Sequence, residues 1–342
     1  GRSLPAHDVE AIVQRAGGNP LFLQELVAAA ADAEELPESV EAVVTARIDA
    51  LAPTDRAVLR WASVLGTRFG VVLLAAVLED EESAEGADAW DRLGEFLELD
   101  PNVAGGFRFR QAVFRDVAYE GLSYKRRREL HRRVAEVYEE RTRPDDPEAA
   151  ELLSLHWSRA GDHERTWRYS LVAGDRAQAK HANVEAAGFY RRALESARRL
   201  PALDASEVAR VWAALGDAAE LAGRYTEAAE AYRSGRRLAE AQLGPQPGLL
   251  LKEGVMRERS GQYAEALRWY TRGLVAAERL ADEEDRRAHR VKLTLAYAGV
   301  RLRQGLFRDC IRRCRAAVED AQDADDLRSL AHAYYLMHLA YT

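Results

Sequence analysis

Cys310 and Cys314 stand four residues apart, a spacing that places two thiols on one face of a helix and could offer two ligands to a zinc ion. A structural zinc site needs four ligands, and no further cysteine or matching histidine pair accompanies them. None of the 8 histidines forms an H-x-x-x-H pair. Because an unligated cysteine packs as a small apolar side chain, the pair predicts a helix interface and no metal site.

The residues needed for catalysis do not come together in any motif. No serine lies in a nucleophile elbow, and paired carboxylates such as Glu34-Glu35 fall on polar faces. The chain also contains no G-x-x-x-x-G-K-[ST] phosphate loop, which would cradle the phosphates of ATP and place a hydroxyl on Mg²⁺. We therefore expect no catalytic residue in this chain, no cofactor bound by it alone and no ATP hydrolysis.

The strongest charge cluster is the run Lys125-Arg126-Arg127-Arg128, followed by His131, Arg132 and Arg133. It could contact a phosphate backbone, or it could be a face that pairs with acidic helices elsewhere. The net charge of the whole chain is −7. This balance favours a structural or interdomain surface over DNA binding.

The elements that could position a binding surface repeat along the second half of the chain. Gly223-x-Tyr225 recurs as Gly261-x-Tyr263 and as Gly305-x-Phe307, at intervals of 38 and 44 residues. A glycine supplies the positive φ at which one helix ends, and the aromatic side chain packs over the turn as the next helix begins. A recurring unit of this kind predicts a stack of helical hairpins.

The best copy resembles the tetratricopeptide repeat (TPR). It reads Trp212-x-x-Leu215-Gly216 in the first helix and Ala228-x-x-x-Tyr232 in the second. A strict TPR has about 34 residues, so these units are stretched. Upstream, Ala186-x-x-x-Tyr190 with Gly174 before it predicts another hairpin, and Gly161-Asp162-His163 another turn. The array is expected to hold about four units.

The resemblance to TPR proteins implies a superhelix in which the first helix of each pair lines the concave face. By repeat position, the predicted partner-binding residues are Arg210, Asp217, Glu220, Leu251, Val255 and Glu258. Charged and apolar groups mixed in this way suit a protein or peptide partner. An array that only spaces domains is the alternative.

The first half divides into two further regions, which gives three predicted domains. Residues 1–52 predict a helical segment, and residues 53–143 predict short helices with a small β-hairpin near Phe107–Arg110, where the apolar residues alternate. Short helices closed by one hairpin indicate a winged helix. Residues 144–342 hold the repeat array, and the fold class is therefore mainly α.

Two sequence motifs in the first half of the chain resemble those of a known family. Gly17-Gly18-Asn19-Pro20-Leu21-Phe22 looks like the lid of the signal-transduction ATPases with numerous domains (STAND), and residues 107–131 look like their winged-helix end. The chain thus resembles the C-terminal part of a bacterial STAND-type ATPase, similar to MalT-like regulators and cyclase-linked ATPases. The lid and winged helix would then precede a TPR sensor that receives a protein, peptide or small-molecule signal.

The resemblance implies a nucleotide-controlled switch in the full-length parent, with ATP or ADP and Mg²⁺ bound by an ATPase domain that this chain lacks. Gly18, Asn19 and Pro20 would lie near the adenine. Gln111 stands where related sequences often carry a histidine that senses phosphate, and glutamine has no positive charge. A MalT-like transcription regulator and the regulatory half of a nucleotide cyclase remain alternatives.

Composition adds the expected location. Two cysteines in 342 residues predict no disulfide framework, and no apolar run is long enough to predict a membrane span. Lysine occurs at only four positions, so arginine makes up nearly all of the 49 basic residues. We expect a cytoplasmic protein from a bacterium with a GC-rich genome.

Overall fold

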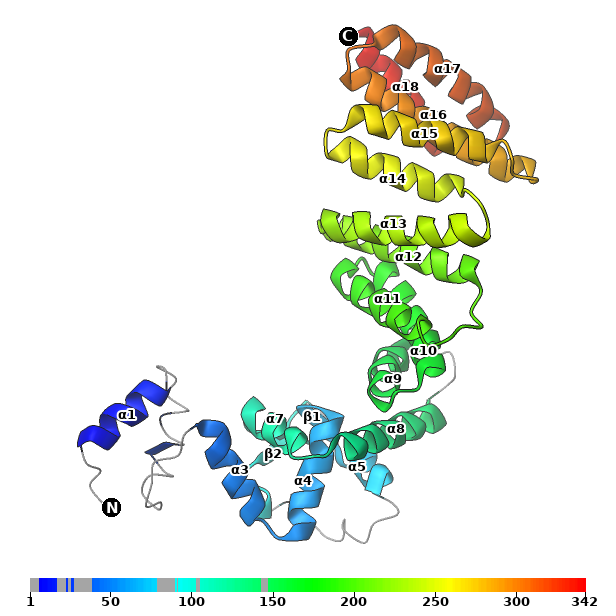
Figure 1. Cartoon of the computed structure of the whole chain (residues 1–342). Coiled ribbons are helices and arrows are strands. Elements are labelled where there is room, and N and C mark those ends of the chain that lie inside the picture. The colour runs from blue at the N-terminus through cyan, green and yellow to red at the C-terminus, as the bar shows by residue number, and fades with distance from the viewer. Residues whose placement is uncertain are drawn as a thin grey trace. The chain divides into compact units, whose positions relative to one another are not determined.

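The computed structural model describes residues 6–16, 23, 26–27, 39–78, 90, 92–102, 105–142 and 147–342. The chain divides into two compact units, Gly1–Asp162 (unit 1) and His163–Thr342 (unit 2). Helices dominate both units, and one small sheet lies in unit 1 (Figure 1). This confirms the predicted fold class, a mainly α chain with a small β element followed by a helical array.

Unit 1 combines short helices with three short strands. Local rules account for several helix starts: the Ser39 hydroxyl caps α3 by accepting from the N–H of Ala42, and Pro53 opens α4. Its described elements are α1 (Ala6–Ala16), α3 (Val40–Ala50), α4 (Pro53–Leu65), β1 (Arg68–Gly70), α5 (Val71–Leu78), β2 (Leu97–Asp100), β3 (Gly106–Phe109), α7 (Ala112–Glu120), α8 (Tyr124–Arg141) and α9 (Pro147–Ala160).

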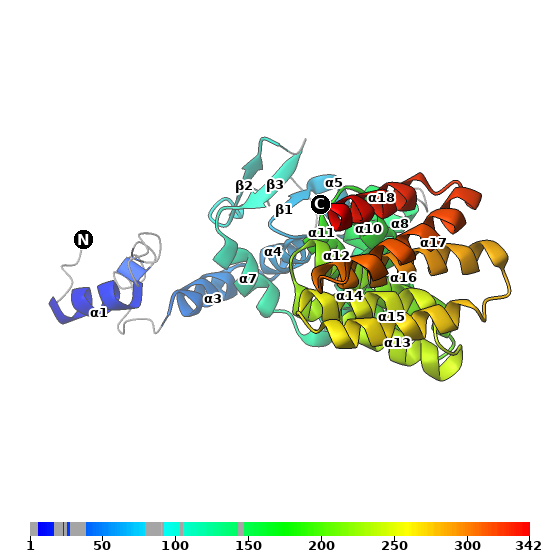
Figure 2. The ribbon, with the colours of Figure 1, turned by 90° about the horizontal axis from the view of Figure 1, so that it is seen from above.

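The three strands form one antiparallel sheet in the order β1, β3, β2 (Figure 2). Phe107 of β3 pairs with Phe69 on one side and with Leu99 on the other. The alternation at Phe107–Arg110 therefore predicted a real strand, and β2 and β3 form the expected hairpin. Trp90 stacks on the Phe107 ring with the centroids 4.6 Å apart.

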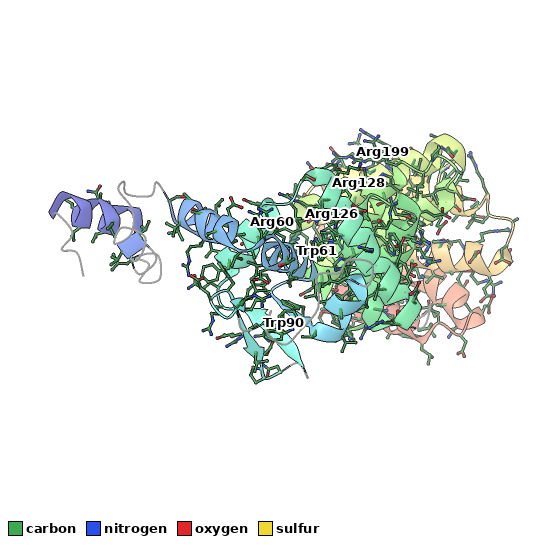
Figure 3. All side chains as sticks on the ribbon, turned by 90° about the horizontal axis from the view of Figure 1, so that it is seen from below. Arg60, Trp61, Trp90, Arg126, Arg128 and Arg199 are labelled. Atoms are coloured by element: carbon green, nitrogen blue, oxygen red, sulfur yellow. The ribbon has the colours of Figure 1, made fainter. Side chains whose placement is uncertain are left out.

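The core of unit 1 is formed by buried residues of α1, α3, α4, α5, α7, α8 and the sheet. Phe96 and Phe114 meet edge to face at 5.3 Å between their centroids, and both are fully buried. The predicted basic run belongs to this unit's own packing: the Arg126 guanidinium lies 5.4 Å from the Trp61 ring (Figure 3), and Arg127 donates to the carbonyl of Glu120. These contacts agree with a structural surface.

Helix α9 belongs to unit 1 because it packs on α8. The indole N–H of Trp157 donates to Oε1 of Glu139 in α8 over 3.1 Å, and Arg128 of α8 donates to a backbone carbonyl at the end of α9. The repeat array is predicted from residue 144, whereas the compact units divide after Asp162. Side-chain contacts between α8 and α9 account for this difference.

Unit 2 is a stack of helical hairpins in chain order (Figure 1). Successive pairs run from α10 with α11 to α16 with α17, and α18 packs on the last pair. The helices are α10 (His163–Ala179), α11 (Asn183–Ala197), α12 (Ala205–Leu221), α13 (Tyr225–Gln242), α14 (Pro247–Arg259), α15 (Tyr263–Ala277), α16 (Glu283–Arg303), α17 (Phe307–Asp323) and α18 (Leu327–Tyr341).

The turn glycines have the predicted backbone. Gly223, Gly261 and Gly305 adopt φ values of 76°, 74° and 74°, and the next helix begins two residues after each. His181 and Asp325 take the same turn position between α10 and α11 and between α17 and α18, with φ values of 59° and 51°. Non-glycine residues rarely adopt this conformation, so glycine is the residue from which such turns are predicted. These two turns carry histidine and aspartate instead and could not be predicted in this way.

Candidate functional site on the first helices of the hairpins

The first three hairpins of unit 2 each place a tyrosine of the second helix against a glycine of the first. An added Cβ at Gly216 would lie 2.3 Å from Cε1 of Tyr232. The same contact joins Tyr190 to Gly174 and Tyr270 to Gly254. Only a glycine permits this approach, so each pair fixes the distance between the two helices of its hairpin.

The fourth hairpin replaces both partners. Cys314 takes the tyrosine position, and Ala298 stands 16 residues before it, the separation that relates each glycine to its tyrosine. Both side chains are fully buried. Burial, with a neighbouring thiol at Cys310, raises the pKa of Cys314 to about 12. A thiol that stays protonated is a poor metal ligand, and no three metal-binding side chains converge in the part of the chain that is described.

The tyrosine hydroxyls contact acidic side chains on the first helix of their own hairpin. Oη of Tyr232 lies 2.6 Å from Oδ1 of Asp217 and 2.9 Å from Oε2 of Glu220. The corresponding bonds run from Tyr190 to Asp175 and from Tyr270 to Glu258. Burial, followed by these carboxylates, raises the pKa of each tyrosine above its ordinary value. Each hydroxyl therefore stays protonated as a donor.

Cations from the next hairpin pair with three of these carboxylates. The pairs are Lys252 with Asp217, Arg259 with Glu220, and Arg303 with Glu258. Asp217, Glu220 and Glu258 thus each bond to a tyrosine of their own hairpin and to a cation of the following first helix. The sequence analysis missed these cations, although the separations of 15 and 12 residues between acid and tyrosine recur along the chain.

The structure places all six predicted partner-binding residues on first helices. Asp217, Glu220 and Glu258 have the intramolecular partners given above. Leu251 and Val255 are half-buried and pack against the apolar cluster around Tyr270. Arg210 is exposed and lines a cavity described below. Contact with a partner stays a prediction for each of them.

Two cavities open along the seam between α13 and α14. One has a volume of about 440 Å³ and is lined by Tyr225 and Arg233 of α13 and by Met256, Arg257 and Arg259 of α14, among others. The second has a volume of about 400 Å³ and lies near the other end of α13, where α12 and α16 also line it. The α13–α14 seam is therefore incompletely filled.

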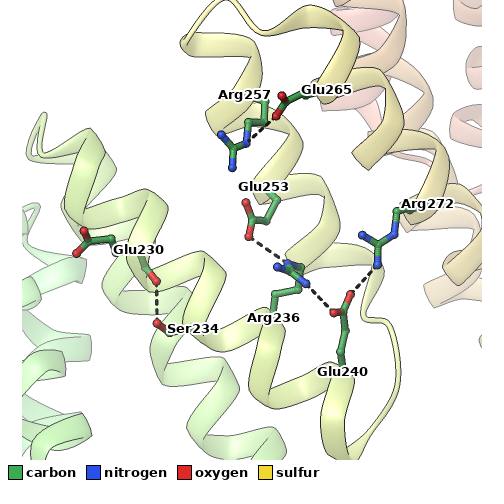
Figure 4. Close-up of polar contacts among 8 residues, drawn as sticks. All are labelled: Glu230, Ser234, Arg236, Glu240, Glu253, Arg257, Glu265 and Arg272. Atoms are coloured by element: carbon green, nitrogen blue, oxygen red, sulfur yellow. Dashed lines mark hydrogen bonds and ion pairs between the residues drawn. The ribbon is translucent and has the colours of Figure 1, made fainter.

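A buried ion pair crosses this seam. Nε of Arg236 in α13 lies 3.1 Å from Oε1 of Glu253 in α14, whose side chain is 3% exposed. Arg236 also pairs with Glu240, which holds Arg272 of the next second helix (Figure 4). The seam between α11 and α12 is instead packed with apolar side chains such as Val211. At the α13–α14 seam, this buried ion pair lies alongside apolar contacts such as Tyr232 with Met256.

The residues predicted to lie near a nucleotide are only partly described. Gly18, Asn19 and Pro20 lie outside the described residues. Gln111 precedes α7 at the N-cap position, where its side chain makes no capping bond. Its Oε1 is buried without a hydrogen-bond partner among the described residues. A buried carbonyl in this state is uncommon and costs free energy. A role for Gln111 in nucleotide sensing stays a prediction.

A buried histidine pair joins α8 to α9. Nδ1 of His131 lies 2.9 Å from Nδ1 of His156, and Oη of Tyr119 lies 3.0 Å from Nε2 of His131. Burial lowers the pKa of His131 to about 3 and that of His156 to about 4. Both rings are therefore neutral at ordinary pH. The pair could not be predicted from the sequence, because a separation of 25 residues carries no local pattern.

Comparisons with known proteins find distant similarity. No protein-family model matches the chain. An uncharacterized protein of Rhizobium meliloti (strain 1021) is 28% identical over 213 residues, which are 58% of this chain and 21% of that protein. The chain thus spans about a fifth of the length of this curated relative. In the described residues, no helix has both the length and the apolar character that a membrane crossing requires.

Two solved structures align with the chain at low scores. A STAND protein with a tetratricopeptide repeat sensor from Pyrococcus horikoshii aligns with a TM-score of 0.35 and 13% identity, covering 99% of this chain and 54% of that one. Aspartyl phosphate phosphatase F from Bacillus subtilis aligns with a TM-score of 0.47 and 12% identity, covering 99% and 81%. Scores at this level identify no function, so functional inference rests on this chain's own residues.

Proposed function

We propose that the helical array of unit 2 binds a protein or peptide on its first helices. The observation that carries this proposal is the cavity shared by α12, α14 and α16, which presents apolar side chains beside the cation of Arg210. The other acidic and basic groups of this face largely pair within the array. A cleft that is mostly apolar with a few polar groups is the usual form of a recognition site.

We further propose that unit 1 couples partner binding to the nucleotide state of a STAND-type ATPase. The Gly17–Phe22 phrase supports this role. The order of α4, β1, α5, β2 and β3 supports a winged helix. In such a parent, an ATPase domain of the same protein would bind ATP or ADP with Mg²⁺, and Gly18–Pro20 would approach the adenine. The orphaned Oε1 of Gln111 would be available to a ligand group.

In both alternatives for the full-length protein, a domain outside this chain would deliver the output of the switch. A MalT-like regulator would use it to control transcription, and a cyclase-linked protein to control nucleotide synthesis. Both readings keep the array as the receiver in a cytoplasmic protein.

Selection from a random peptide library tests the binding role. The full 342-residue chain is expected to retain peptides, and bound peptide should slow amide hydrogen exchange in α12, α14 and α16 more than in α11 and α17. A library that yields no binder, or peptides that protect only the second helices, would contradict the proposal.

An ATP hydrolysis assay separately tests the proposal that nucleotide is bound by an ATPase domain and not by this chain alone. With ATP and Mg²⁺, the purified chain should release no more phosphate than a buffer blank, since it has no phosphate loop. Turnover that depends on Mg²⁺ and persists after repurification would show that the chain is itself an ATPase.

A further inference from the structure

The cavity of about 440 Å³ between α13 and α14 is lined by three arginines, and we call it the arginine-lined cavity. Arg233 comes from α13, and Arg257 and Arg259 come from α14. Among the described lining residues the acidic one is Glu253, which is buried and pairs with Arg236 (Figure 4). Because the charge of Glu253 is already balanced, the three arginines attract an anion into the cavity.

Arg233 has no partner within the array. In the described part of the chain its guanidinium makes no hydrogen bond, ion pair or ring contact, although the residue is half-buried. A partly desolvated cation without a counter-charge costs free energy, and a bound anion would remove this cost. Tyr225 and Ala229 lie eight and four residues before Arg233, so the three share one face of α13 and line the same cavity.

The two arginines of α14 keep hydrogen-bond donors to spare. Arg257 donates to Oε1 of Gln262 over 3.0 Å and lies 3.5 Å from a carboxylate oxygen of Glu265. Arg259 pairs with Glu220 at 2.6 Å. A guanidinium group carries five N–H donors, so each side chain retains donors beyond these contacts. Both can therefore join Arg233 in binding one anion.

The number of arginines indicates the kind of anion. A carboxylate has two oxygens, and a single guanidinium group can bind both of them side by side. A phosphate monoester has three terminal oxygens and a charge of about −1.5 to −2 at pH 7. Three guanidinium groups on two helices match three oxygens. The cavity is therefore better suited to a phosphate group than to a carboxylate.

An apolar surface lies beside the arginines. Ala229 and Met256 line the cavity, and the side chain of Tyr225 is 52% exposed. The Arg259 guanidinium lies 5.3 Å from the centroid of the Tyr225 ring, so this ring neighbours the cations. An aromatic group attached to the phosphate can stack on it. A volume of about 440 Å³ lies within the range of small-molecule sites.

We propose that the arginine-lined cavity binds a phosphate monoester of an aromatic group, with the phosphate held by Arg233, Arg257 and Arg259 and the ring on Tyr225. The ligand would join two successive hairpins across a seam that their own side chains fill incompletely. The two cavities of this seam share none of their described lining residues. The site is therefore independent of the peptide binding proposed for the first helices.

Phenyl phosphate tests this site on the full 342-residue chain at pH 8, where the ester is a dianion. Isothermal titration calorimetry should give a dissociation constant on the order of 1 mM, as the size of the ligand allows. Benzenesulfonate has the same ring and three terminal oxygens but a single charge, so it should bind about 10-fold more weakly. Inorganic phosphate lacks the ring and should bind about 2- to 10-fold more weakly.

Two matched variants of α13 locate the site. Arg233→Gln should weaken the binding of phenyl phosphate by about 10-fold, because it removes the guanidinium that has no other partner. Arg237→Gln removes an exposed cation one turn further along α13 that is not among the lining residues, and it should change binding by less than about 2-fold. Neither arginine has a described partner, so both variants should keep the parent's melting temperature.

Two further comparisons test the ring and its source. Tyr225→Ala should reduce the affinity for phenyl phosphate to that for inorganic phosphate, while inorganic phosphate binds within about 2-fold of its parent affinity. N-acetyl-phosphotyrosine amide carries a main chain in addition to the ring. If it binds as tightly as phenyl phosphate, a phosphorylated protein can supply the ester, whereas weaker binding indicates a free aryl phosphate.

Three results would overturn the inference. The first is equal binding of phenyl phosphate and benzenesulfonate, because the site is matched to a dianion. The second is an equal effect of Arg233→Gln and Arg237→Gln, which would show attraction by overall charge only. The third is neither a heat of binding nor a rise in melting temperature with phenyl phosphate up to about 20 mM.

Discussion

The ring of Tyr232 lies against the backbone of Gly216 so closely that an added Cβ would sit 2.3 Å from Cε1 of the tyrosine. A glycine inside a helix costs about 0.5–1 kcal/mol relative to alanine. The array keeps it because the helices of the hairpin could not otherwise approach, and the buried hydroxyl of Tyr232 could not reach Asp217.

Gly216→Ala should lower the free energy of unfolding by about 1–3 kcal/mol, because the methyl group forces the Tyr232 ring to move. Urea unfolding followed by circular dichroism measures the change. Gly188→Ala is the matched control, since a Cβ there meets nothing within 4 Å in helix α11. It should be neutral or stabilise by up to about 1 kcal/mol. Equal effects of the two variants would refute the contact.

Gly223→Val should destabilise unit 2, because Gly223 holds a φ of 76° that a β-branched residue resists. The expected loss is about 1–2 kcal/mol. Gly223→Asn should lose less, since asparagine enters this conformation more readily. A thermal melt of the three proteins gives the order glycine, asparagine, valine. No atom lies within 4 Å of a Cβ at this position, so steric contact does not explain a loss of stability. A different order of melting temperatures would show that the backbone conformation is not its cause either.

Glu253→Gln should cost about 3 kcal/mol, because it leaves the buried Arg236 guanidinium without its full counter-charge. Glu265→Gln removes a carboxylate from a more exposed pair with Arg257 and should cost less than about 1 kcal/mol. Both pairs appear in Figure 4. Denaturant midpoints compare them directly.

Joint replacement tests whether the seam needs the charges at all. Arg236→Met combined with Glu253→Leu should recover most of the lost stability, since apolar packing can replace a buried pair. A double variant less stable than Glu253→Gln would mean that Arg236 supports the seam mainly through Glu240.

Stability should fall as the pH drops from about 6.5 towards 4, because the buried rings of His131 and His156 stay neutral. The folded-state pKa values are about 3 and about 4, whereas an unfolded histidine takes up a proton near pH 6.5. The unfolded state therefore binds more protons in this window. The loss is about 1.4 kcal/mol per pH unit for each histidine. Urea midpoints at several pH values measure it.

His156→Gln removes one of these titrating groups, so its stability should depend less steeply on pH. Exposed His338 supplies the control, and His338→Gln should keep the parent slope. His289 and His332 also have pKa values lowered by burial, so they contribute to the pH dependence of the parent chain. The contribution of His131 and His156 is therefore measured by comparing the His156→Gln and His338→Gln variants. NMR ring signals of His131 and His156 that titrate near pH 6 would contradict the buried pair.

The sequence by itself determined the features that depend on local backbone and spacing. Gly223 and its two counterparts marked turns because φ near 75° excludes most other residues, and the alternation at Phe107 marked a strand. Tyr190 and Tyr232 marked second helices because a tyrosine four residues after an alanine recurs in the first three hairpins. These signals lie within a few residues of one another along the chain.

Only the tertiary structure decided which residues form hydrogen bonds and ion pairs with one another. Within the chain, Asp217 bonds to a tyrosine 15 residues away and to Lys252, 35 residues away, and its contact with a partner stays a prediction. His131 and His156 meet because α9 packs on α8, and the α13–α14 seam leaves room for a cavity beside Arg210. The physical reason is that burial and charge pairing depend on distances in space, which the packing of whole helices sets and local sequence spacing does not.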